Sequence, residues 1–305
     1  MKHFNILVIS IILYSFTATA ESSWDELAYQ GKKYREEGNL AKAVQFLSAA
    51  ADKKRTNNHE LYLYAGILAA RLDNSDEAFK LLNKSIRSGM WDIHRLERNS
   101  RLQNIRQDKR WNDLIESIKT EENRYLSRAK ITHPELRSQL KTMWEKDQNF
   151  VGRKEQLNVI KSNSIELKKI IADIGWPTKS KVGRDGEWLA WAITQHSHDI
   201  EFQKMCLGYL KNLTLDDKID PVYFAELTDR IARNTGSSQI YGMAIIRENG
   251  KKMFYQIFDP ENVDIRRSEI GLPPIKVWAN ENFVEIDPLA NKKSQQDSPV
   301  GVPLL

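Results

Sequence analysis

The sequence reads GKKYREEGNLAKAVQFLSAA at residues 31–50 and GILAARLDNSDEAFKLLNKS at residues 66–85, and these two stretches decide the fold of the first half. Equivalent positions lie 35 residues apart: Gly31, Tyr34, Ala43, Leu47 and Ala50 recur as Gly66, Ala69, Ala78, Leu82 and Ser85. Gly-Asn and Asp-Asn pairs mark a turn within each stretch. Because small residues let helices approach closely and larger ones fill the gap, each stretch predicts a pair of packed helices.

This period resembles that of the tetratricopeptide repeat, which is about 34 residues long. The resemblance implies stacked helix pairs that offer a groove to a peptide or partner protein. The chain departs from the family at Leu27 and Tyr62, where tryptophan is usual, and at Met90, where proline is usual. Residues 96–118 predict a partial third unit or a capping helix. The helices of the predicted domain 21–130 therefore either bind a partner or only support the second half.

The first twenty residues have the pattern of a secretory signal peptide. A basic start precedes an apolar run over 4–16, and Ala18 and Ala20 form an A-x-A cleavage signal. The run is shorter than the roughly 20 residues of a transmembrane helix, and an uncleaved N-terminal anchor is the alternative. We expect cleavage after Ala20, a periplasmic or secreted location, and no transmembrane segment in the mature chain. Cys206 fits an oxidising compartment as a buried core residue rather than a catalytic thiol.

The positive charge is local. The formal net charge is +5, and one of these charges leaves with the signal peptide. Residues 131–305 hold equal numbers of basic and acidic side chains, whereas 87–110 holds seven basic and three acidic ones and so carries the surplus. A nucleic-acid-binding protein would spread basic and aromatic residues over a recognition surface, so we expect no nucleic acid. The stretch 87–110 either meets an anionic partner or is a solvated face.

A second domain is predicted over 131–290, followed by a disordered tail over 291–305. Apolar periodicity and capping residues predict helices over 134–148, 155–174, 186–197, 200–212 and from 221 to before 236, with Asn163 as a candidate break. Residues 240–247 and 251–258 are β-rich and flank Glu248-Asn249-Gly250, an N-G hairpin signal. The predicted fold class is mainly α: tetratricopeptide-like helical hairpins followed by a mostly helical α+β domain with one C-terminal β-hairpin.

The second half also contains short motifs that are specific as a set. They are Gly175-Trp-Pro-Thr178, Val182-Gly183, Ala190-Trp191, Gln195-His196, Phe202-Gln203, Asp229-Arg230, Gln239-Ile-Tyr-Gly242, and Val263-Asp264-Ile-Arg266-Arg267 before Gly271-Leu-Pro273. With these motifs, most of 131–280 resembles a bacterial domain family of unknown function, the one numbered 6624. The chain has Met243 and Ala244 where that family often has Thr and Gln. The family has no established activity, so the resemblance implies no reaction.

The candidate catalytic residues begin with the histidine of the motif Gln195-His196. His196, Asp199 and Gln203 stand at i, i+3 and i+7, so a continuous helix would place them on one face. An imidazole beside a carboxylate can act as an oriented general base. We expect Asp199 or Asp229 to orient His196. The alternatives are a core histidine and ordinary ion pairs on the helix surface.

Polar and aromatic residues complete a predicted ligand pocket in the same domain. Its expected members are Trp176, Trp191, Gln195, Gln203, Arg230, Gln239, Tyr241, Arg266 and Arg267. Tryptophan faces, including that of Trp188, would wall the pocket as they do in sugar-binding sites, although helix packing is the default role of a tryptophan. Glu187 is a further candidate acid and equally an ordinary first-turn carboxylate.

Several classes of protein lack support in the sequence. No HExxH spacing, P-loop, dinucleotide fingerprint or G-x-S-x-G elbow occurs, so we expect no metal and no cofactor. Two functions stay open: an exported protein- or ligand-binding module, and a hydrolase that acts on envelope material.

Overall fold

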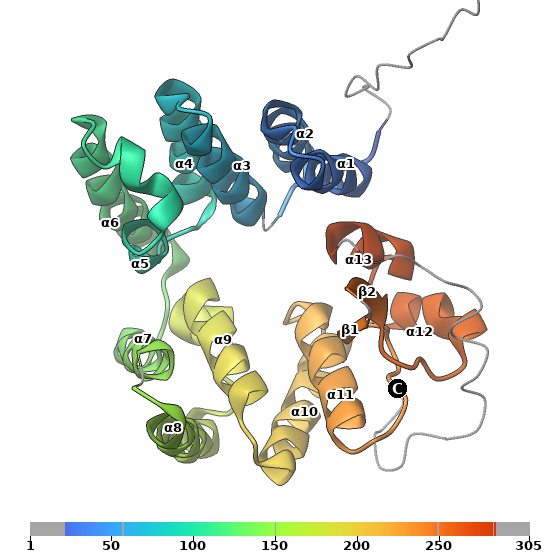
Figure 1. Cartoon of the computed structure of the whole chain (residues 1–305). Helices are drawn as coiled ribbons and strands as arrows, with labels where there is room; N and C mark the ends of the chain where they lie inside the picture. Colours follow the sequence, from blue (N-terminus) through green and yellow to red (C-terminus); the bar gives the residue numbers. More distant parts are fainter. Residues whose placement is uncertain (1–21, 57, 150, 249, 283, 285–305) are drawn as a thin grey trace, which may run out of the picture.

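The computed structural model describes residues 22–284, apart from positions 57, 150, 249 and 283. The predicted signal peptide and the predicted tail over 291–305 lie outside this part of the chain. Within it, no helix combines the length and the apolar character needed to cross a membrane. The described residues form helices and one two-stranded antiparallel sheet near the C-terminal end, which confirms the predicted fold class (Figure 1).

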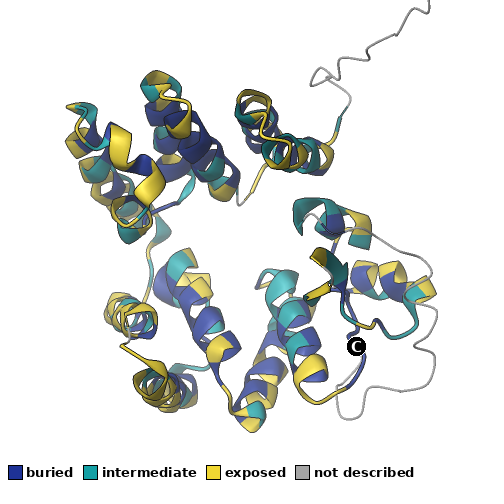
Figure 2. Ribbon diagram, in the orientation of Figure 1, coloured by how far each residue is buried: buried dark blue, intermediate teal, exposed yellow. Residues whose placement is uncertain are grey.

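The chain begins with two helical hairpins. Their helices are α1 (Trp24–Glu36), α2 (Leu40–Lys53), α3 (His59–Arg71) and α4 (Ser75–Ser88). The helices α1 and α2 pack together, as do α3 and α4, and α2 also contacts α3. Figure 2 shows α3 buried over most of its length, because neighbours cover it on several sides.

The 35-residue period of the sequence reappears in the contacts between the helices. A Cβ atom added at Gly31 would lie 2.7 Å from Leu47 Cγ, and one added at Gly66 would lie 2.9 Å from Leu82 Cγ. Both distances are below normal van der Waals contact, so only glycine lets each helix pair pack this closely. Equivalent leucines therefore pack against equivalent glycines in the two hairpins.

The turns of the two hairpins are also equivalent. The Asn39 side chain accepts a hydrogen bond from the backbone N–H of Lys42 at 3.2 Å, and Asn74 accepts one from Glu77 at 3.1 Å. Each asparagine thus caps the second helix of its hairpin and pairs one of the N–H groups that a helix start leaves without a partner.

The following segment caps the hairpins but is not a complete third unit. It consists of α5 (His94–Glu97), the 3₁₀ helix η1 (Ser100–Ile105) and the long helix α6 (Arg110–Ala129). The helix α6 packs against α4, and η1 packs against α3. Residues of this segment, including Trp111 and Leu114, belong to the hydrophobic core of the hairpins.

The second half contains five longer helices: α7 (Pro134–Gln148), α8 (Arg153–Ile174), α9 (Lys179–His196), α10 (Ile200–Leu215) and α11 (Pro221–Asn234). The candidate break at Asn163 is wrong, because this side chain is buried and donates a hydrogen bond to the Met143 carbonyl at 3.0 Å, outside α8. The helix α9 starts earlier than predicted and kinks at Gly183, whose φ is +80°. These helices share a separate core that includes Cys206, and burial raises the pKa of its thiol to about 12.

The predicted β-hairpin is present but shorter than expected. Its strands are β1 (Ile245–Glu248) and β2 (Lys251–Phe254), paired from Ile245 opposite Phe254 to Glu248 opposite Lys251. The strand starts late because the backbone before it turns at Gly242, whose φ is +69°, and bonds to side chains instead of a partner strand. The chain then forms η2 (Pro260–Asn262), α12 (Val263–Glu269) and α13 (Ile275–Asn282).

The two halves meet at two separate places (Figure 1). On one side the Arg184 guanidinium of α9 lies 4.2 Å from the ring centroid of Trp91. On the other side α13 packs against α1, where Asn280 donates to Asp25 at 2.8 Å. Nearby, Lys54 forms an ion pair with Glu281 at 2.6 Å. The helix that ends the described chain therefore rests on the helix that begins it.

Candidate functional site

The helices α9 and α11 form the walls of a cleft in the C-terminal domain. Trp191 of α9 donates from Nε1 to the Tyr223 carbonyl of α11 at 3.3 Å. The rings of these two residues stack with centroids 5.1 Å apart. This contact joins the helices. The residues of α9 and α11 that line the cleft all follow Trp191 and Tyr223 in the sequence, so the cleft lies nearer the C-terminal ends of the two helices.

The cleft has a volume of about 200 Å³ and is mostly polar. Its lining comes from α9, α11 and the segment that leads into β1: Gln195, Glu226, Arg230, Arg233, Met243, Ala244 and Ile245. Burial raises the pKa of the Glu226 carboxyl to about 7, against the opposing charge of Arg230. Burial and the neighbouring Arg233 lower the pKa of Arg230. A carboxyl group with a pKa near 7 can either donate or accept a hydrogen bond at neutral pH.

Gln195 is a residue of the cleft lining with an unsatisfied hydrogen-bond donor. It is only 5% exposed, and its Nε2 atom has no hydrogen-bond partner. A buried donor without a partner costs about 1–3 kcal/mol. Met243 and Ala244, where the family motif often has Thr and Gln, line the same cleft. Neither of these two side chains can accept a hydrogen bond from the glutamine as an amide or hydroxyl oxygen would.

Aromatic side chains continue from the cleft across α9 to α7. We call Trp144, Trp188, Trp191 and Tyr223 the aromatic row. Neighbouring rings are 5.2 Å apart for Trp144 and Trp188, and 6.4 Å apart for Trp188 and Trp191. Trp188 is 40% exposed, which is unusual for so large an apolar side chain. The aromatic row therefore gives this surface flat apolar faces next to polar groups.

His196 lies at the far end of the aromatic row, where its ring is 5.1 Å from that of Trp144. Its Nδ1 is 2.6 Å from the carboxylate of Asp147, which is only 4% exposed. The imidazole side chain itself is 41% exposed. A buried carboxylate thus orients an accessible imidazole, the arrangement expected for His196, but the acid comes from α7.

Asp199 does not have the predicted role. The helix α9 ends at His196, and Asp199 caps α10 by accepting the Phe202 N–H at 2.9 Å. Its second oxygen accepts from Lys168 at 2.9 Å. The continuous helix that would align His196, Asp199 and Gln203 is therefore wrong, because the chain turns between them. Gln203 is buried and donates to the Ser197 carbonyl at 2.9 Å, which fixes that turn.

The Asp229 carboxylate binds backbone N–H groups and does not orient the His196 imidazole. It is fully buried and accepts the N–H groups of Ile240 at 2.6 Å, Tyr241 at 3.0 Å and Met243 at 2.7 Å. Burial raises its pKa to about 6, although these hydrogen bonds oppose the shift. The carboxylate is saturated by backbone donors, so it is not available as a base.

Other predicted ligand residues support the same segment. Gln239 donates to the carbonyls of Ala244 at 3.0 Å and Tyr255 at 2.6 Å, and accepts the Ala244 N–H at 2.7 Å. Arg267 is 1% exposed and donates to the Tyr241 carbonyl at 2.5 Å. These groups fix the backbone that forms one wall of the cleft.

The remaining predicted residues divide between the fold and the cleft. Arg266 donates to the Ile240 carbonyl at 3.1 Å, and Trp176 is buried in the core. Glu187 is also buried, where it accepts the Lys179 N–H at the start of α9 at 2.7 Å. Burial raises its pKa to about 7. Of the predicted ligand residues, Gln195 and Arg230 line the cleft, while Trp191 lies one helical turn before Gln195 on α9 and is not part of the lining.

Sequence reasoning missed Asp147, Trp144 and Tyr223. Asp147 and His196 are 49 positions apart, and no local pattern connects them. Tyr223, Glu226 and Arg230 stand at i, i+3 and i+7, so the helical spacing of α11 could have placed the tyrosine beside the cleft. Among the described residues, no group of three or more histidine, cysteine or acidic side chains could hold a metal ion.

One comparison with known proteins finds a match. Residues 134–283 match the model of a family of unknown function, DUF6624. No curated protein and no solved structure matches the chain. The family match includes α7 to α13, so the cleft, the aromatic row and the His196–Asp147 pair all lie within it. The tetratricopeptide resemblance of the first half stays a prediction.

Proposed function

We propose that this chain is an exported binding protein whose C-terminal domain holds a saccharide in the cleft between α9 and α11. The pattern of residues 1–20 supports export. The combination of flat apolar faces with a few converging polar groups, which is characteristic of small-molecule sites, supports binding.

The observation that carries the proposal is the buried, unpaired Nε2 of Gln195 at the cleft wall. A ligand oxygen placed in the cleft would accept this hydrogen bond and remove the desolvation cost of the amide group. A hydroxyl group suits the site because it can also donate to Glu226 when that carboxyl is ionised.

The surroundings of Gln195 favour a sugar over other small ligands. One face of a pyranose ring consists of C–H groups, and the aromatic rings of Trp191 and Tyr223, which stack on each other about one helical turn from the lining residues Gln195 and Glu226, would supply an apolar surface for it. Its hydroxyl groups need several donors and acceptors, which Gln195, Glu226 and Arg230 supply. A volume of about 200 Å³ is below the roughly 300–1,000 Å³ of drug-sized pockets, so the cleft suits a single sugar unit.

The test is calorimetric titration of the mature protein with single sugars, including N-acetylglucosamine, N-acetylmuramic acid and neutral hexoses. We expect at least one to bind, and Trp191→Ala to weaken that binding about tenfold, the effect of roughly 1.4 kcal/mol of lost ring contact. No heat of binding with any sugar at millimolar concentration would refute the proposal.

Two glutamine variants separate binding from folding. Gln195→Leu removes an amide whose Nε2 has no hydrogen-bond partner, so we expect it to abolish sugar binding without lowering the free energy of unfolding. Gln239→Leu is the matched control: it removes three hydrogen bonds, so the free energy of unfolding should fall. Unchanged sugar binding by Gln195→Leu would remove the basis of the site. Export is checked separately by sequencing the N-terminus of envelope-fraction protein, which should begin at Glu21.

A second candidate function, hydrolysis of envelope material, has one observation in its favour. The buried Asp147 carboxylate holds the exposed His196 ring by Nδ1, as an orienting acid holds a general base. The residues first expected to form this catalytic group, Asp199 and Asp229, have other partners.

Hydrolysis is tested with cell-wall fragments and product analysis by mass spectrometry. His196→Ala should abolish new products and Asp147→Asn should reduce them, while sugar binding in the cleft persists in both variants. Identical product profiles for the wild type and His196→Ala would eliminate hydrolysis and leave the binding proposal untouched.

A further inference from the structure

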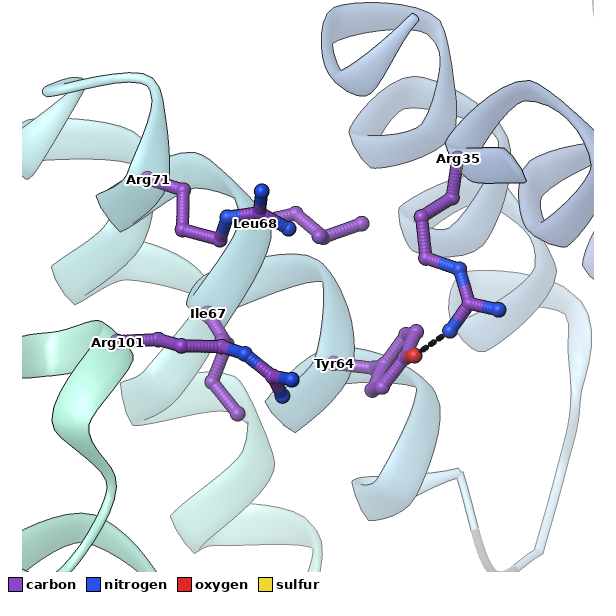
Figure 3. A pocket seen from close by; sticks show the side chains of 6 residues that line it. All are labelled: Arg35, Tyr64, Ile67, Leu68, Arg71 and Arg101. Atoms are coloured by element: carbon purple, nitrogen blue, oxygen red, sulfur yellow. Dashed lines mark hydrogen bonds between the residues drawn. The ribbon is translucent and has the colours of Figure 1, made fainter. Parts of the chain in front are cut away.

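A second pocket lies in the N-terminal half, away from the α9–α11 cleft. It has a volume of about 240 Å³ and is lined by Arg35, Tyr64, Ile67, Leu68, Arg71 and Arg101. We call it the arginine pocket. Figure 3 shows the side chains of Arg71 and Arg101 extending over α3 toward Arg35, whose guanidinium donates to the Tyr64 hydroxyl. Three guanidinium groups thus come from three elements: α1, α3 and η1.

No acidic side chain lines the arginine pocket. Arg35 has one carboxylate nearby, that of Glu36 at 3.5 Å, which is the next residue on α1. Arg71 and Arg101 are exposed, and within the described part of the chain neither guanidinium forms an ion pair or a side-chain hydrogen bond. The positive charge of the pocket is therefore largely uncompensated by the protein.

Four other arginines of the basic stretch 87–110 have partners within the fold, whereas Arg87, like Arg101, is exposed and forms no ion pair or side-chain hydrogen bond with the described residues. Arg95 pairs with Glu60, and Arg110 pairs with Asp76 at 2.7 Å. Arg106 donates to the Asn99 carbonyl at 2.9 Å. Of the two arginines of the stretch without such a partner, Arg101 lines the arginine pocket and Arg87 does not, so Arg101 is the one that can act together with Arg35 and Arg71.

Apolar side chains adjoin the charged groups. Ile67 and Leu68 of α3 form the floor of the arginine pocket. One turn beyond Leu68, Leu72 is 43% exposed and extends this apolar surface past the arginines. An inorganic anion would use only the guanidinium groups, whereas a peptide can place carboxylates on them and an apolar side chain between.

We propose that the arginine pocket binds an acidic segment of a partner protein, in which carboxylate side chains flank an apolar one. Guanidinium groups match carboxylates in a planar, two-pronged geometry. Because they lie on separate elements, they can pair with separate carboxylates of an extended chain. The apolar floor supplies the contact between them.

The test uses the mature protein and an array of capped pentapeptides of the form Glu-X-Glu-X-Glu, where X covers the apolar residues and, as a polar reference, serine. We expect several members to bind, and their glutamine counterparts not to bind. Arg71→Gln combined with Arg101→Gln should weaken binding at least about tenfold, because two partly exposed ion pairs are lost. The matched control is Arg55→Gln, which neutralises an exposed arginine outside the pocket and should leave binding unchanged.

A charge reversal makes the test independent of folding defects. The double variant Arg71→Glu with Arg101→Glu should lose the acidic peptides and bind the corresponding Lys-X-Lys-X-Lys array. The proposal fails if no acidic peptide binds the wild type. It also fails if inorganic phosphate displaces the peptides and serine at X binds as well as leucine, since the pocket would then be a site for anions alone.

Discussion

The N-terminal hairpins and the C-terminal domain are held together by different kinds of contact. In the hairpins a glycine on one helix meets a leucine on the next, as Gly66 meets Leu82, and the contact stays within one hairpin. In the C-terminal domain, buried polar side chains hold distant backbone: Asp229 binds three N–H groups, and Arg267 reaches the Tyr241 carbonyl. The first half is thus held together by close helix–helix contacts that recur every 35 residues. The second half depends on individual buried polar side chains, and no other group could replace their hydrogen bonds.

The largest expected effect is at Asp229. Replacement by alanine leaves the N–H groups of Ile240, Tyr241 and Met243 buried without their acceptor, beside the buried charge of Arg267. We expect the free energy of unfolding of the C-terminal domain to fall by about 3–5 kcal/mol, as when one partner of a buried charged network is removed. Urea unfolding followed by tryptophan fluorescence measures it.

The control for this prediction is Asp173→Ala, which removes an exposed carboxylate and should change the free energy of unfolding by less than about 0.5 kcal/mol. If Asp229→Ala were as stable as Asp173→Ala, the stated difference between the two halves would be incorrect.

The next effect tests the close approach in the hairpins. Gly66→Ala places a Cβ 2.9 Å from Leu82 Cγ, so we expect a loss of about 1–3 kcal/mol from overpacking, measured by thermal and urea unfolding. Gly208→Ala is the matched control, because this glycine lies on an exposed face of α10 with open space around it. It should gain about 0.5–1 kcal/mol. A gain at both positions would show that the hairpins do not need glycine.

The two halves should also respond oppositely to pH. Burial raises the pKa of Glu226 to about 7, so between about pH 4.5 and 7 the folded state binds a proton that the unfolded state has lost. Stability of the C-terminal domain therefore falls as the pH rises through this window. We expect Glu226→Gln to remove on the order of 1–2 kcal/mol of that fall, measured by urea unfolding at pH 5 and 7.5. An equally steep fall in this variant would contradict the assignment.

Glu60 on α3 supplies the contrast. Burial acts to raise its pKa, but the hydrogen bonds and positive charge of Arg95 and His59 together outweigh burial and hold the pKa at about 2. Its contribution is complete above the ordinary carboxyl pKa and is lost as the pH falls through that value toward 2. Acidification from pH 7 to 5 therefore leaves the contribution of Glu60 to stability intact. The same acidification stabilises the C-terminal domain through Glu226.

The smallest effect tests the equivalence of the two hairpins. Asn39→Ala and Asn74→Ala each remove the side-chain cap of a second helix, so each should cost about 1 kcal/mol in the free energy of unfolding. Thermal unfolding of the two variants under identical conditions gives the comparison. Losses that differed by more than about 1 kcal/mol would mean that the hairpins are not equivalent.

The hairpins could be predicted from the sequence because their decisive contacts recur at a fixed spacing. The site could be predicted only in part. Gln195 and Arg230 fall where expected, but Asp147 reaches His196 through the packing of α7 on α9, which no local pattern encodes. The end of one helix before Asp199 was indicated in the sequence, since aspartate is a preferred N-cap residue of the next helix. The helices predicted over 186–197 and 200–212 already separated His196 from Gln203, so the alignment of these residues on one helix face contradicted those bounds.

Three of the residues predicted as ligands but found in the fold share one physical property. Gln203, Gln239 and Arg267 are polar and nearly fully buried, with their hydrogen bonds going to backbone carbonyls. Sequence shows that such a side chain is polar, but whether it faces a ligand or the protein's own backbone depends on tertiary packing.

The contact between α1 and α13 connects the two halves a second time, in addition to the linker between them. A protein joined at one linker can swing about it, but here a rotation near Lys130 would also have to separate Asn280 from Asp25 and Lys54 from Glu281. These contacts therefore hold the arginine pocket and the α9–α11 cleft at a constant distance from each other. A partner that engages both would be selected by its length as well as by its chemistry.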